Sequence, residues 1–497
     1  MNNKSTLMKN TLSIAFGSVL MRAMGLYLQI YTASHIKADV IGVFGLISSA
    51  YMIFVTIAIS GIRFCTTRIV AQEVSLGNNY PKKLMKSAFR YGLFFGVLSG
   101  VCLFCMSGFI AKIWIGDNSA LIPLRLLSLA LPFIPISAAI EGYFTAKQKA
   151  LRLVIVQFFD QAVKILLVIA GFTLFLKKGV NPCIILCAST IVSEIIYTCV
   201  LLILFLFEVW GKEGKSNSGI IHITKTALPL AVSAYMRTGL SSIGHMIIPK
   251  GLCRAGMSKG GAFVTYGIIH QMALPVVMFP SAILSALGEV LIGRLTYSQS
   301  LKQRIGISYI VNRAMRIGAI FSFGVAGYMF FHSALLGEMI YKNSEAGFYI
   351  RIMAPLVPII YCDCVTDGCL KGLGQQLWCM IYNILEAALN IFLLLVLLPR
   401  LAIAGYIVAM YVKEIFNFVL SLRRLYKITT VEIRIAPLLC ILLSSIAAKI
   451  ISAIVTSSQS LLLLSIIYFS LYGVLIYITN SITRDDLKWV LNVCSEA

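Results

Sequence analysis

Charged residues are scarce in this chain. Only 12% of its 497 residues are Asp, Glu, Lys or Arg, whereas 59% are hydrophobic. A soluble domain usually carries about twice that charged fraction. The low charge therefore excludes an ordinary soluble protein and indicates a polytopic membrane protein.

Acidic residues are scarcer still. The chain has 19 Asp and Glu against 42 Lys and Arg, which gives a net charge of +23. With a cytoplasmic N-terminus, most basic residues fall in cytoplasmic segments, as the positive-inside rule expects. Topology and anionic lipid headgroups therefore explain the basic excess, and we expect no nucleic-acid partner. The sequence predicts a cell-membrane protein with both termini cytoplasmic.

Motifs for catalysis and for metal binding are missing. The sequence contains no Gly-x-x-x-x-Gly-Lys-Ser/Thr phosphate loop, and the connecting segments are short. Cys102 and Cys105 have the spacing of a metal-ligand pair, but among the 13 cysteines and 5 histidines no second pair or histidine cluster accompanies them at ligand spacing. We therefore expect no enzyme activity, no metal site and no cofactor. Any pumping would draw on a Na⁺ or H⁺ gradient or on the membrane potential.

Long apolar runs recur along the whole chain. Each is close to the roughly 20 residues that a helix needs to cross about 30 Å of hydrocarbon. They predict an all-α membrane protein with about 14 transmembrane helices. The runs lie near residues 11–35, 41–61, 88–111, 121–145, 152–176, 183–207, 225–249, 261–288, 315–340, 349–371, 376–398, 401–423, 433–455 and 460–480.

Two of these runs resemble each other. Residues 11–25 and 226–239 each carry a Met-Arg pair at the same distance from an opening threonine, which aligns Arg22 with Arg237. An arginine near the middle of a membrane helix costs about 2.5–3.5 kcal/mol on insertion scales, so it usually faces a partner or a watery cavity. We expect both arginines to face one cavity. The alternative is two separate buried ion pairs with carboxylates, namely Glu141, Glu194 or Asp160.

A second pair of stretches extends this duplication. The prolines Pro132 and Pro135 precede an acidic-Gly pair at residues 141–142, and Pro355 and Pro358 precede another at 367–368. A separation of six helices preserves orientation, so the two copies would be parallel. The expected lobes are residues 1–211 and 212–427, each with six helices, followed by an additional helix pair in 428–497.

Polar residues within the predicted helices mark candidate sites. Asp160 and Lys164 lie four residues apart, and we favour a structural ion pair between them. Asn383, Glu386 and Asn390 place oxygen atoms on one stripe, which would hold a monovalent cation or a proton, or would make hydrogen bonds between helices.

Other polar residues are expected to line the cavity. Gln29 shares the helical face of Arg22. For His270 we favour a hydrogen-bonded packing role over a proton relay. The residues assigned to the cavity are Gln29, Asp160, Lys164, Glu141, His270, Asp363 and Asp367.

Four short motifs carry a resemblance to a known family. They are residues 60–73, 141–148, 266–275 and 403–406. In this order the chain resembles the multidrug/oligosaccharidyl-lipid/polysaccharide flippase superfamily, most closely its stage V sporulation protein B and lipid II flippase branch. The resemblance implies a MATE-like arrangement of two six-helix lobes around a cavity that opens alternately to each side. It also implies a lipid-sized groove beside the last two helices.

The same resemblance implies a substrate on an undecaprenyl pyrophosphate carrier. Arg22 matches the pyrophosphate-binding arginine of helix 1, and Arg63 is a looser match for that of helix 2. A sodium site formed by an acidic residue on helix 7 and Asn or Asp on helix 11 is implied as well. Helix 7 carries Arg237 and no acid here, which puts that site in doubt.

The leading hypothesis is a flippase for a lipid-linked oligosaccharide such as a peptidoglycan precursor, used in the cell wall or the spore cortex. A cation-coupled multidrug exporter and a non-transporting scaffold for wall synthesis are the alternatives. Arg22 and Arg237 favour the flippase because guanidinium groups chelate phosphate oxygens. We expect a monomer whose partners are membrane lipids, the substrate and cell-wall synthesis enzymes.

Overall fold

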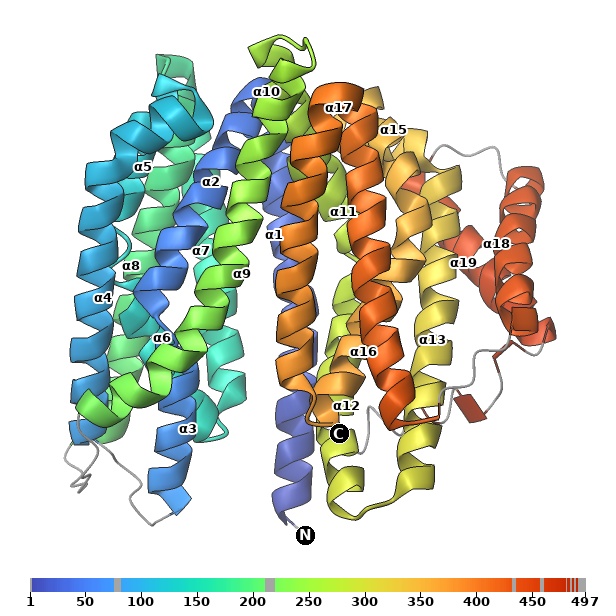
Figure 1. The fold of residues 1–497 in the computed structure, drawn as a ribbon, viewed down its shortest axis with the longest axis horizontal. Coiled ribbons are helices and arrows are strands. Elements are labelled where there is room, and N and C mark those ends of the chain that lie inside the picture. The colour runs from blue at the N-terminus through green and yellow to red at the C-terminus, as the bar shows by residue number, and fades with distance from the viewer. Residues whose placement is uncertain are drawn as a thin grey trace. The chain divides into compact units, whose positions relative to one another are not determined.

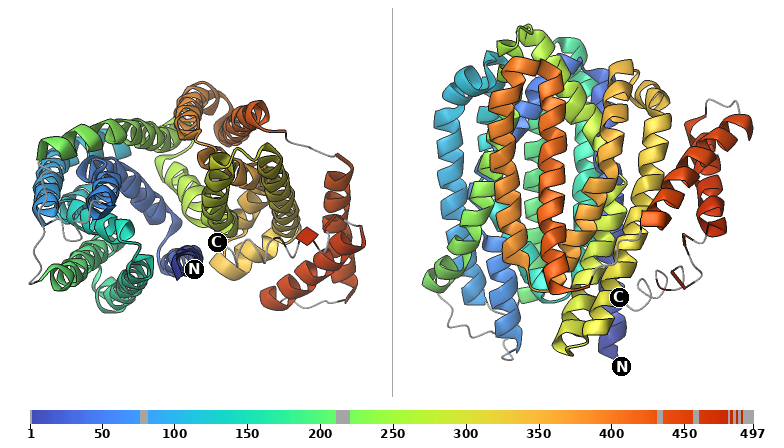
Figure 2. Two further views of the ribbon diagram at one scale, coloured as in Figure 1. Left: turned by 90° about the horizontal axis from the view of Figure 1, so that it is seen from below. Right: turned by 45° about the vertical axis from the view of Figure 1, so that its right-hand side comes forward.

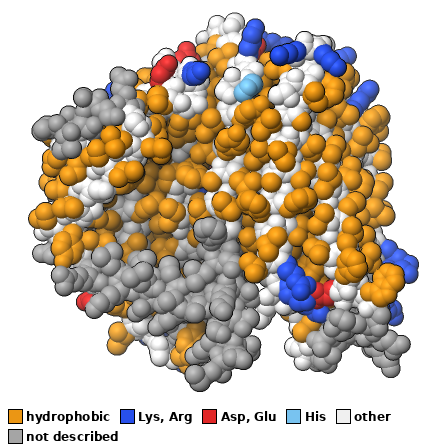
Figure 3. All heavy atoms as spheres, turned by 180° about the vertical axis from the view of Figure 1, so that it is seen from behind, with side chains coloured by type: hydrophobic (Ala, Val, Ile, Leu, Met, Phe, Trp, Pro, Cys, Tyr) orange, Lys and Arg blue, Asp and Glu red, His pale blue; other side chains and the backbone are white. Residues whose placement is uncertain are grey.

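The computed structural model describes residues 2–75, 82–210, 220–430, 435–455 and 460–479, with 481–482, 485–486 and 489. Its elements are all helices, and within these residues there is no strand. Nine helical segments of the described residues are long and apolar enough to cross a membrane. Hydrophobic side chains cover much of the described surface in Figure 3, with Lys and Arg near its upper and lower edges. The predicted all-α polytopic fold class is confirmed.

The chain packs into two compact units. Residues 36–267 form one, which we call the N-unit. Residues 1–35 and 268–497 form the other, which we call the C-unit. Each is described by itself below.

The N-unit consists of helices α2 to α10 (Figure 1). An apolar core joins several of them, with Ile62, Tyr143 and Leu201 fully buried. Its elements are α2 (Ala38–Ile59), α3 (Ile62–Ser75), α4 (Lys82–Phe109), the π-helix η1 (Ile110–Ile115), the 3-10 turn η2 (Asn118–Ala120), α5 (Leu121–Ser128), α6 (Ile134–Ala146), α7 (Ala150–Phe175), η3 (Leu176–Lys178), α8 (Pro182–Val209), α9 (Ile220–Arg254) and α10 (Lys259–Gly267).

The C-unit consists of α1 and the elements from η4 onward. Its elements are α1 (Asn2–His35), the π-helix η4 (Ile268–Ala273), α11 (Leu274–Met278), α12 (Ser281–Ser300), α13 (Arg304–Phe331), α14 (Ser333–Tyr341), α15 (Ser344–Met353), η5 (Ala354–Leu356), α16 (Val357–Gly372), α17 (Gln376–Ile428), α18 (Ile435–Val455) and α19 (Leu461–Ile478).

Several predicted spans contain a break. The span at 121–145 is α5 and α6, separated at residues 129–133, and the span at 349–371 is α15, η5 and α16. Both breaks coincide with the proline pairs, because proline lacks the N–H that continues a helix. The span at 41–61 continues into α3 through Ser60 and Gly61, whose φ angles of 42° and 72° are left-handed. Bends thus occur at related places in the two proposed repeats.

The weakly separated spans at 376–398 and 401–423 are two arms of α17. Ala402 lies between them with φ 48° and ψ −127°, shortly after Pro399. The two arms stand side by side in Figure 1. The prediction of two helices is therefore correct, and a single non-helical residue is enough to reverse the chain.

The packed units differ from the lobes expected from the sequence. Helix α1 belongs to the C-unit, where it packs on α12. Helix α9 belongs to the N-unit, where it packs on α2, α3 and α4. The first helix of each proposed repeat thus packs with the helices of the other repeat. The boundaries 1–211 and 212–427 remain a prediction about the duplication.

The last two helices pack on α13, as the right-hand view of Figure 2 shows. Tyr472 donates a hydrogen bond to the carbonyl of Ile320 at 2.7 Å, and Tyr468 shares one with Ser445 at 2.8 Å. Gly324 faces the ring of Tyr472, where any Cβ would collide. Small residues on α13 thus let the tyrosines of α19 lie against its backbone. The helix pair expected in 428–497 corresponds to α18 and α19.

Candidate functional site

Arg22 lies on α1 and is held by hydroxyl groups of α12. Its Nη1 donates to Ser281 Oγ at 2.9 Å and its Nη2 to Ser285 Oγ at 3.5 Å. Its charge also acts on Glu289, one further turn along α12. Residues four apart lie on the same helical face, so these three side chains form one polar stripe toward α1.

Arg22 forms no ion pair with any other described residue. Its side chain is exposed, so protein atoms leave much of it uncovered. Neutral hydroxyls satisfy some of its five N–H donors without neutralising its charge. The arrangement orients a guanidinium that can still bind an anion. The sequence left open a separate buried ion pair at Arg22, and the described residues form no such pair.

Arg237 lies on α9 in the N-unit and is also exposed. It makes no hydrogen bond or ion pair with a described residue. Its neighbours anchor the helix instead: Tyr235 donates to Ser60 Oγ at 2.6 Å, and Thr238 accepts from Thr56 at 3.2 Å. Because Arg22 and Arg237 belong to different units, their shared cavity stays a prediction.

Arg63 pairs with Glu141 inside the N-unit. Arg63 Nε lies 3.2 Å from Glu141 Oε2, and Tyr197 donates a hydrogen bond to the same carboxylate. Glu141 is buried, whereas about half of the Arg63 side chain is exposed (49%). A substrate phosphate would have to share Arg63 with Glu141. Glu141 would therefore compete with the predicted phosphate for Arg63, and the sequence alone did not identify this competition.

The ion pair expected between Asp160 and Lys164 is not among those formed by the described residues, but the two charges act on each other, and the pair remains a prediction. Asp160 Oδ1 is buried and has no hydrogen-bond partner within the described part of the chain. Lys164 lies in the field of two carboxylates, Asp160 and Glu194, because α7 packs on α8. Glu194 in turn accepts a hydrogen bond from Ser137 at 3.2 Å. Helical spacing alone did not reveal the second carboxylate.

The ammonium group of Lys413 lies at the stripe formed by Asn383, Glu386 and Asn390. Lys413, on the other arm of α17, lies 3.0 Å from Glu386 Oε1 and 2.5 Å from Glu414 Oε1. An ammonium group at the carboxylate competes with any free ion there. The cation site on this stripe remains a prediction, with Lys413 as an argument against it.

The remaining candidates for the cavity all lie in the C-unit. Gln29 is exposed on α1, and the other three make hydrogen bonds or ion pairs with described residues. His270 hydrogen-bonds the Tyr406 hydroxyl at 3.1 Å, in line with a packing role. Asp367 pairs with Lys371 at 3.2 Å. Asp363 accepts a hydrogen bond from Asn417 at 2.9 Å.

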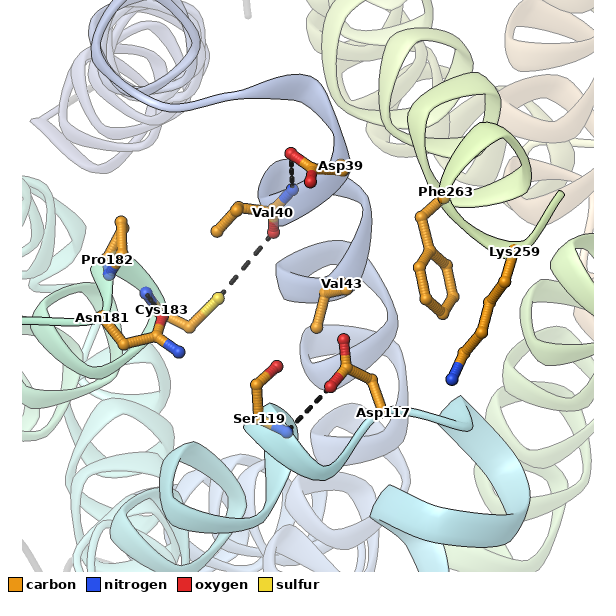
Figure 4. Close-up of a pocket in the computed structure, with 11 residues that line it drawn as sticks. Asp39, Val40, Val43, Asp117, Ser119, Asn181, Pro182, Cys183, Lys259 and Phe263 are labelled. Carbon is orange, nitrogen blue, oxygen red and sulfur yellow. Dashed lines mark hydrogen bonds between the residues drawn. The ribbon is translucent and has the colours of Figure 1, made fainter.

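A pocket of about 580 Å³ lies elsewhere in the N-unit (Figure 4). Its polar groups largely cap backbone: Asp117 accepts from the Ser119 N–H at 2.8 Å, and Asn181 accepts from the Cys183 N–H at 2.9 Å. None of the predicted site residues lines it. Its lining is Asp39, Val40, Val43, Asp117, Ser119, Asn181, Pro182, Cys183, Lys259, Gly260 and Phe263.

Comparison with known proteins identifies the family. A family profile described as "Polysaccharide biosynthesis protein" matches residues 7–296, more than half of the chain. The chain belongs to this family. The membership confirms the flippase superfamily expected from the motifs and makes the chain an integral membrane protein.

Similar proteins span almost the whole chain. Stage V sporulation protein B of Bacillus subtilis (strain 168) is 23% identical over 507 residues, covering 98% of each chain. The solved structure "Lipid II flippase MurJ, inward closed conformation" has a TM-score of 0.73 at 13% identity, covering 94% of this chain and 98% of that one. An inward-facing MATE-family multidrug resistance transporter reaches 0.66 at 12% identity, covering 85% and 98%. These structures establish a shared fold.

Sequence reasoning missed the partners of the predicted residues. Ser281 and Ser285 are one turn apart, which is visible in the sequence, but nothing there indicated that α1 packs against them. Tyr197 and Lys413 are likewise distant in sequence from Glu141 and Glu386. Their roles follow from helix packing.

Proposed function

We propose that this protein is a flippase that moves an undecaprenyl-pyrophosphate-linked oligosaccharide across the cytoplasmic membrane by alternating access. The observation that supports this most is Arg22, an exposed membrane-helix guanidinium held by two serine hydroxyls and in no ion pair with a described residue. The Arg22 charge acts on Glu289 without forming an ion pair with it, and a membrane-helix arginine is costly unless an anionic ligand uses it.

The chemistry of the ligand follows from the donor. A pyrophosphate must exchange water for fixed hydrogen-bond donors when it enters an apolar protein. A planar guanidinium supplies paired donors, and such charge-assisted bonds are roughly twice as strong as neutral ones. Arg237 would supply a second guanidinium and Arg63 a third, the last in competition with Glu141. The substrate would be a peptidoglycan precursor, in keeping with the similar structure of a lipid II flippase.

Cation-coupled multidrug export is the second candidate. It is favoured by the carboxylates Asp160 and Glu194 of the N-unit, since a cationic drug needs acidic groups, and by the MATE-type fold. Lys164 opposes it, because its ammonium already lies in the field of both carboxylates. We therefore prefer the flippase.

The test is translocation in proteoliposomes that contain the purified full chain. Lipid II, a polyprenyl pyrophosphate with a different glycan, and a cationic dye would be supplied in parallel. Flipping of a pyrophosphate-linked lipid with no dye transport is the expected result. Dye export without lipid flipping would replace this function with the exporter. Failure to move any of the three would favour a non-transporting scaffold.

A further inference from the structure

We propose that the pocket of about 580 Å³ in the N-unit binds a neutral sugar through Asp39, Asp117 and Lys259 (Figure 4). Its volume falls within the range of about 300–1,000 Å³ that is usual for small-molecule sites. With the cytoplasmic N-terminus expected from the sequence, this end of the N-unit lies on the outer side of the membrane. If the protein is a flippase, the pocket would hold the glycan of the lipid after its crossing, and in that role the inference rests on the proposed function.

Four connections of the N-unit meet around this pocket. Figure 4 shows their side chains around the first turns of α2. The polar ones are Asp39 from the start of α2, Asp117 from the connection between η1 and η2, Asn181 from the residue before α8, and Lys259 from the start of α10. Residues that are far apart in the sequence thus line one cavity within one unit.

A close helix contact fixes one wall of the pocket. Phe263 of α10 lines it, and a Cβ on Gly42 of α2 would collide with the Phe263 carbonyl. Gly267 approaches the carbonyl of Ala38 in the same way. Small residues therefore let the backbones of α2 and α10 touch directly. This wall is pre-formed, as the walls of small-molecule sites usually are.

Both aspartates of the pocket keep one carboxylate oxygen for a ligand. Asp39 Oδ1 accepts a hydrogen bond from the Val40 N–H at 2.9 Å, and Asp117 Oδ1 accepts one from the Ser119 N–H at 2.8 Å. Within the described part of the chain, the second oxygen of each makes no hydrogen bond and neither carboxylate is in an ion pair. Two charged acceptors thus remain available at the pocket.

Lys259 supplies a donor that pairs with neither aspartate. Gly116 has a left-handed φ of 80° and turns the chain just before Asp117, and a Cβ on it would lie 3.8 Å from Lys259 Cε. The Lys259 side chain therefore reaches the residue next to Asp117, yet its Nζ makes no ion pair or hydrogen bond with a described residue. Asn181 uses its Oδ1 on the Cys183 N–H at 2.9 Å, which leaves its amide N–H groups as further donors. The pocket thus offers both donors and acceptors.

This mixture of charges disfavours a charged ligand. An anion would face the two aspartates, and an organic cation would share the pocket with the ammonium group of Lys259, so each would meet a like charge. The described residues also contain no cluster of three side chains that could hold a metal ion. A neutral ligand avoids these conflicts.

A sugar uses every part of the pocket. Each of its hydroxyl groups both donates and accepts a hydrogen bond, so it can bind the aspartates and Lys259 without adding charge. Hydrogen bonds to ionised groups are roughly twice as strong as those between neutral groups. The apolar side chains of Val43 and Pro182 suit the C–H face of a sugar ring. A neutral ligand rich in hydroxyl groups therefore matches the site best.

The experiment is equilibrium dialysis of the purified full chain against the radiolabelled disaccharide of N-acetylglucosamine. We expect saturable binding. Asp117→Asn should weaken it at least about tenfold, because a charged acceptor is lost. Its Tm should stay unchanged, because asparagine caps a helix start as well as aspartate does. Lys259→Met should weaken binding as well. Lys177→Met is the matched control, since Lys177 is an exposed lysine of η3 outside the lining, and it should bind as the wild type does.

Spermidine and inorganic pyrophosphate, supplied in parallel, represent the cationic and anionic ligands. A wild-type protein that does not bind the sugar would overturn the site, and binding of either charged probe that depends on Asp117 would then identify the correct class. Sugar binding with an unchanged Kd in both Asp117→Asn and Lys259→Met would also overturn it. If Asp117→Asn fails to fold, Lys259→Met alone decides. Sugar binding by a protein that flips no lipid would refute the proposed function and leave this site intact, and flipping without sugar binding would do the reverse.

Discussion

The two units use the same helix contact in different ways. In the C-unit, α1 meets the start of α12 and Arg22 itself donates to Ser281 at 2.9 Å. In the N-unit, α9 meets the bend between α2 and α3, but Tyr235 donates to Ser60 and leaves Arg237 without a described partner. Ser60 lies at the bend between α2 and α3, and Ser281 begins α12 directly after the turn at residues 279–280. One arginine is therefore anchored and its counterpart is not, although the sequence aligns them.

A second comparison concerns the acidic-Gly pairs. A Cβ on Gly142 would collide with the Thr66 side chain and lie 2.6 Å from the carbonyl of Arg63, where α6 crosses α3. A Cβ on Gly368 would lie 2.7 Å from the Cα of Gly288, where α16 crosses α12. The glycine of each pair thus lets two helix backbones approach, as small residues do in membrane helix packing. In this respect the two units are alike, since each has a close approach of two helices at the glycine.

The largest expected effect is at Arg22. Arg22→Ala should abolish flipping of a polyprenyl-pyrophosphate substrate, and Arg22→Lys should impair it, because lysine keeps the charge but loses the planar fork. Arg237→Ala should weaken transport less, since that side chain is not held in place. Substrate affinity and translocation in proteoliposomes measure all three, with yield and Tm as controls. Wild-type affinity in Arg22→Ala would refute the pyrophosphate role, and a collapse in its stability would indicate a structural one.

Next come the glycines of the acidic-Gly pairs. Gly142→Ala and Gly368→Ala should each destabilise the protein by about 1–3 kcal/mol through overpacking. Gly142→Ala should be the worse, because its Cβ meets both a side chain and a backbone carbonyl. Gly293→Ala is the control, since no described atom lies within 4 Å of its Cβ position. Thermal unfolding in detergent measures the Tm of each variant and so ranks their stabilities. Equal Tm values for all three variants would contradict the close approach of the helix backbones at Gly142 and Gly368.

A smaller effect is expected at the serines of the shared contact. Removing both Ser281 and Ser285 hydroxyls should weaken substrate affinity a few fold, because each lost hydrogen bond is worth about 0.5–1.5 kcal/mol and Arg22 loses its orientation. Ser60→Ala should instead lower Tm and leave affinity unchanged, since Ser60 anchors tyrosines and not Arg237. An equal loss of affinity in both variants would mean that the two contacts are only structural.

The smallest effect concerns basic residues at helix ends. Lys82, Lys83 and Lys86 are exposed at the start of α4, whereas Arg313 and Arg316 of α13 pair with buried Asp486 at 2.7 and 3.6 Å. Neutralising the three lysines should weaken binding to anionic vesicles, at about 1 kcal/mol per residue at low salt. Neutralising the two arginines should lower Tm instead. Vesicle binding that is identical at low and high ionic strength would show that the lysines serve topology alone.

Much of the fold follows from local sequence. Apolar runs located the helices because a chain in hydrocarbon must satisfy its backbone within each helix. The proline pairs lie at the breaks at residues 129–133 and 354–356, because proline lacks the N–H that continues a helix, although α9 continues through Pro229 and Pro249. Arg22 was also identifiable, since a charge inside an apolar run is conspicuous without any structure. Each of these features is decided by residues within one or two helical turns.

Partner choice was decided by tertiary structure. Nothing local states that α1 packs with α12 or that α9 packs with α2. The spacing of Asp160 and Lys164 predicted an interaction within one helix, but only the packing of α7 on α8 adds the charge of Glu194 to that of Asp160 at Lys164. Asp363 meets Asn417 and Ser421 only because α16 packs on the second arm of α17. Hydropathy indicates that a helix lies in the membrane but does not indicate which helices it packs against, because lipid and protein interiors are equally apolar. The packing partner is determined by how closely the helix surfaces fit together.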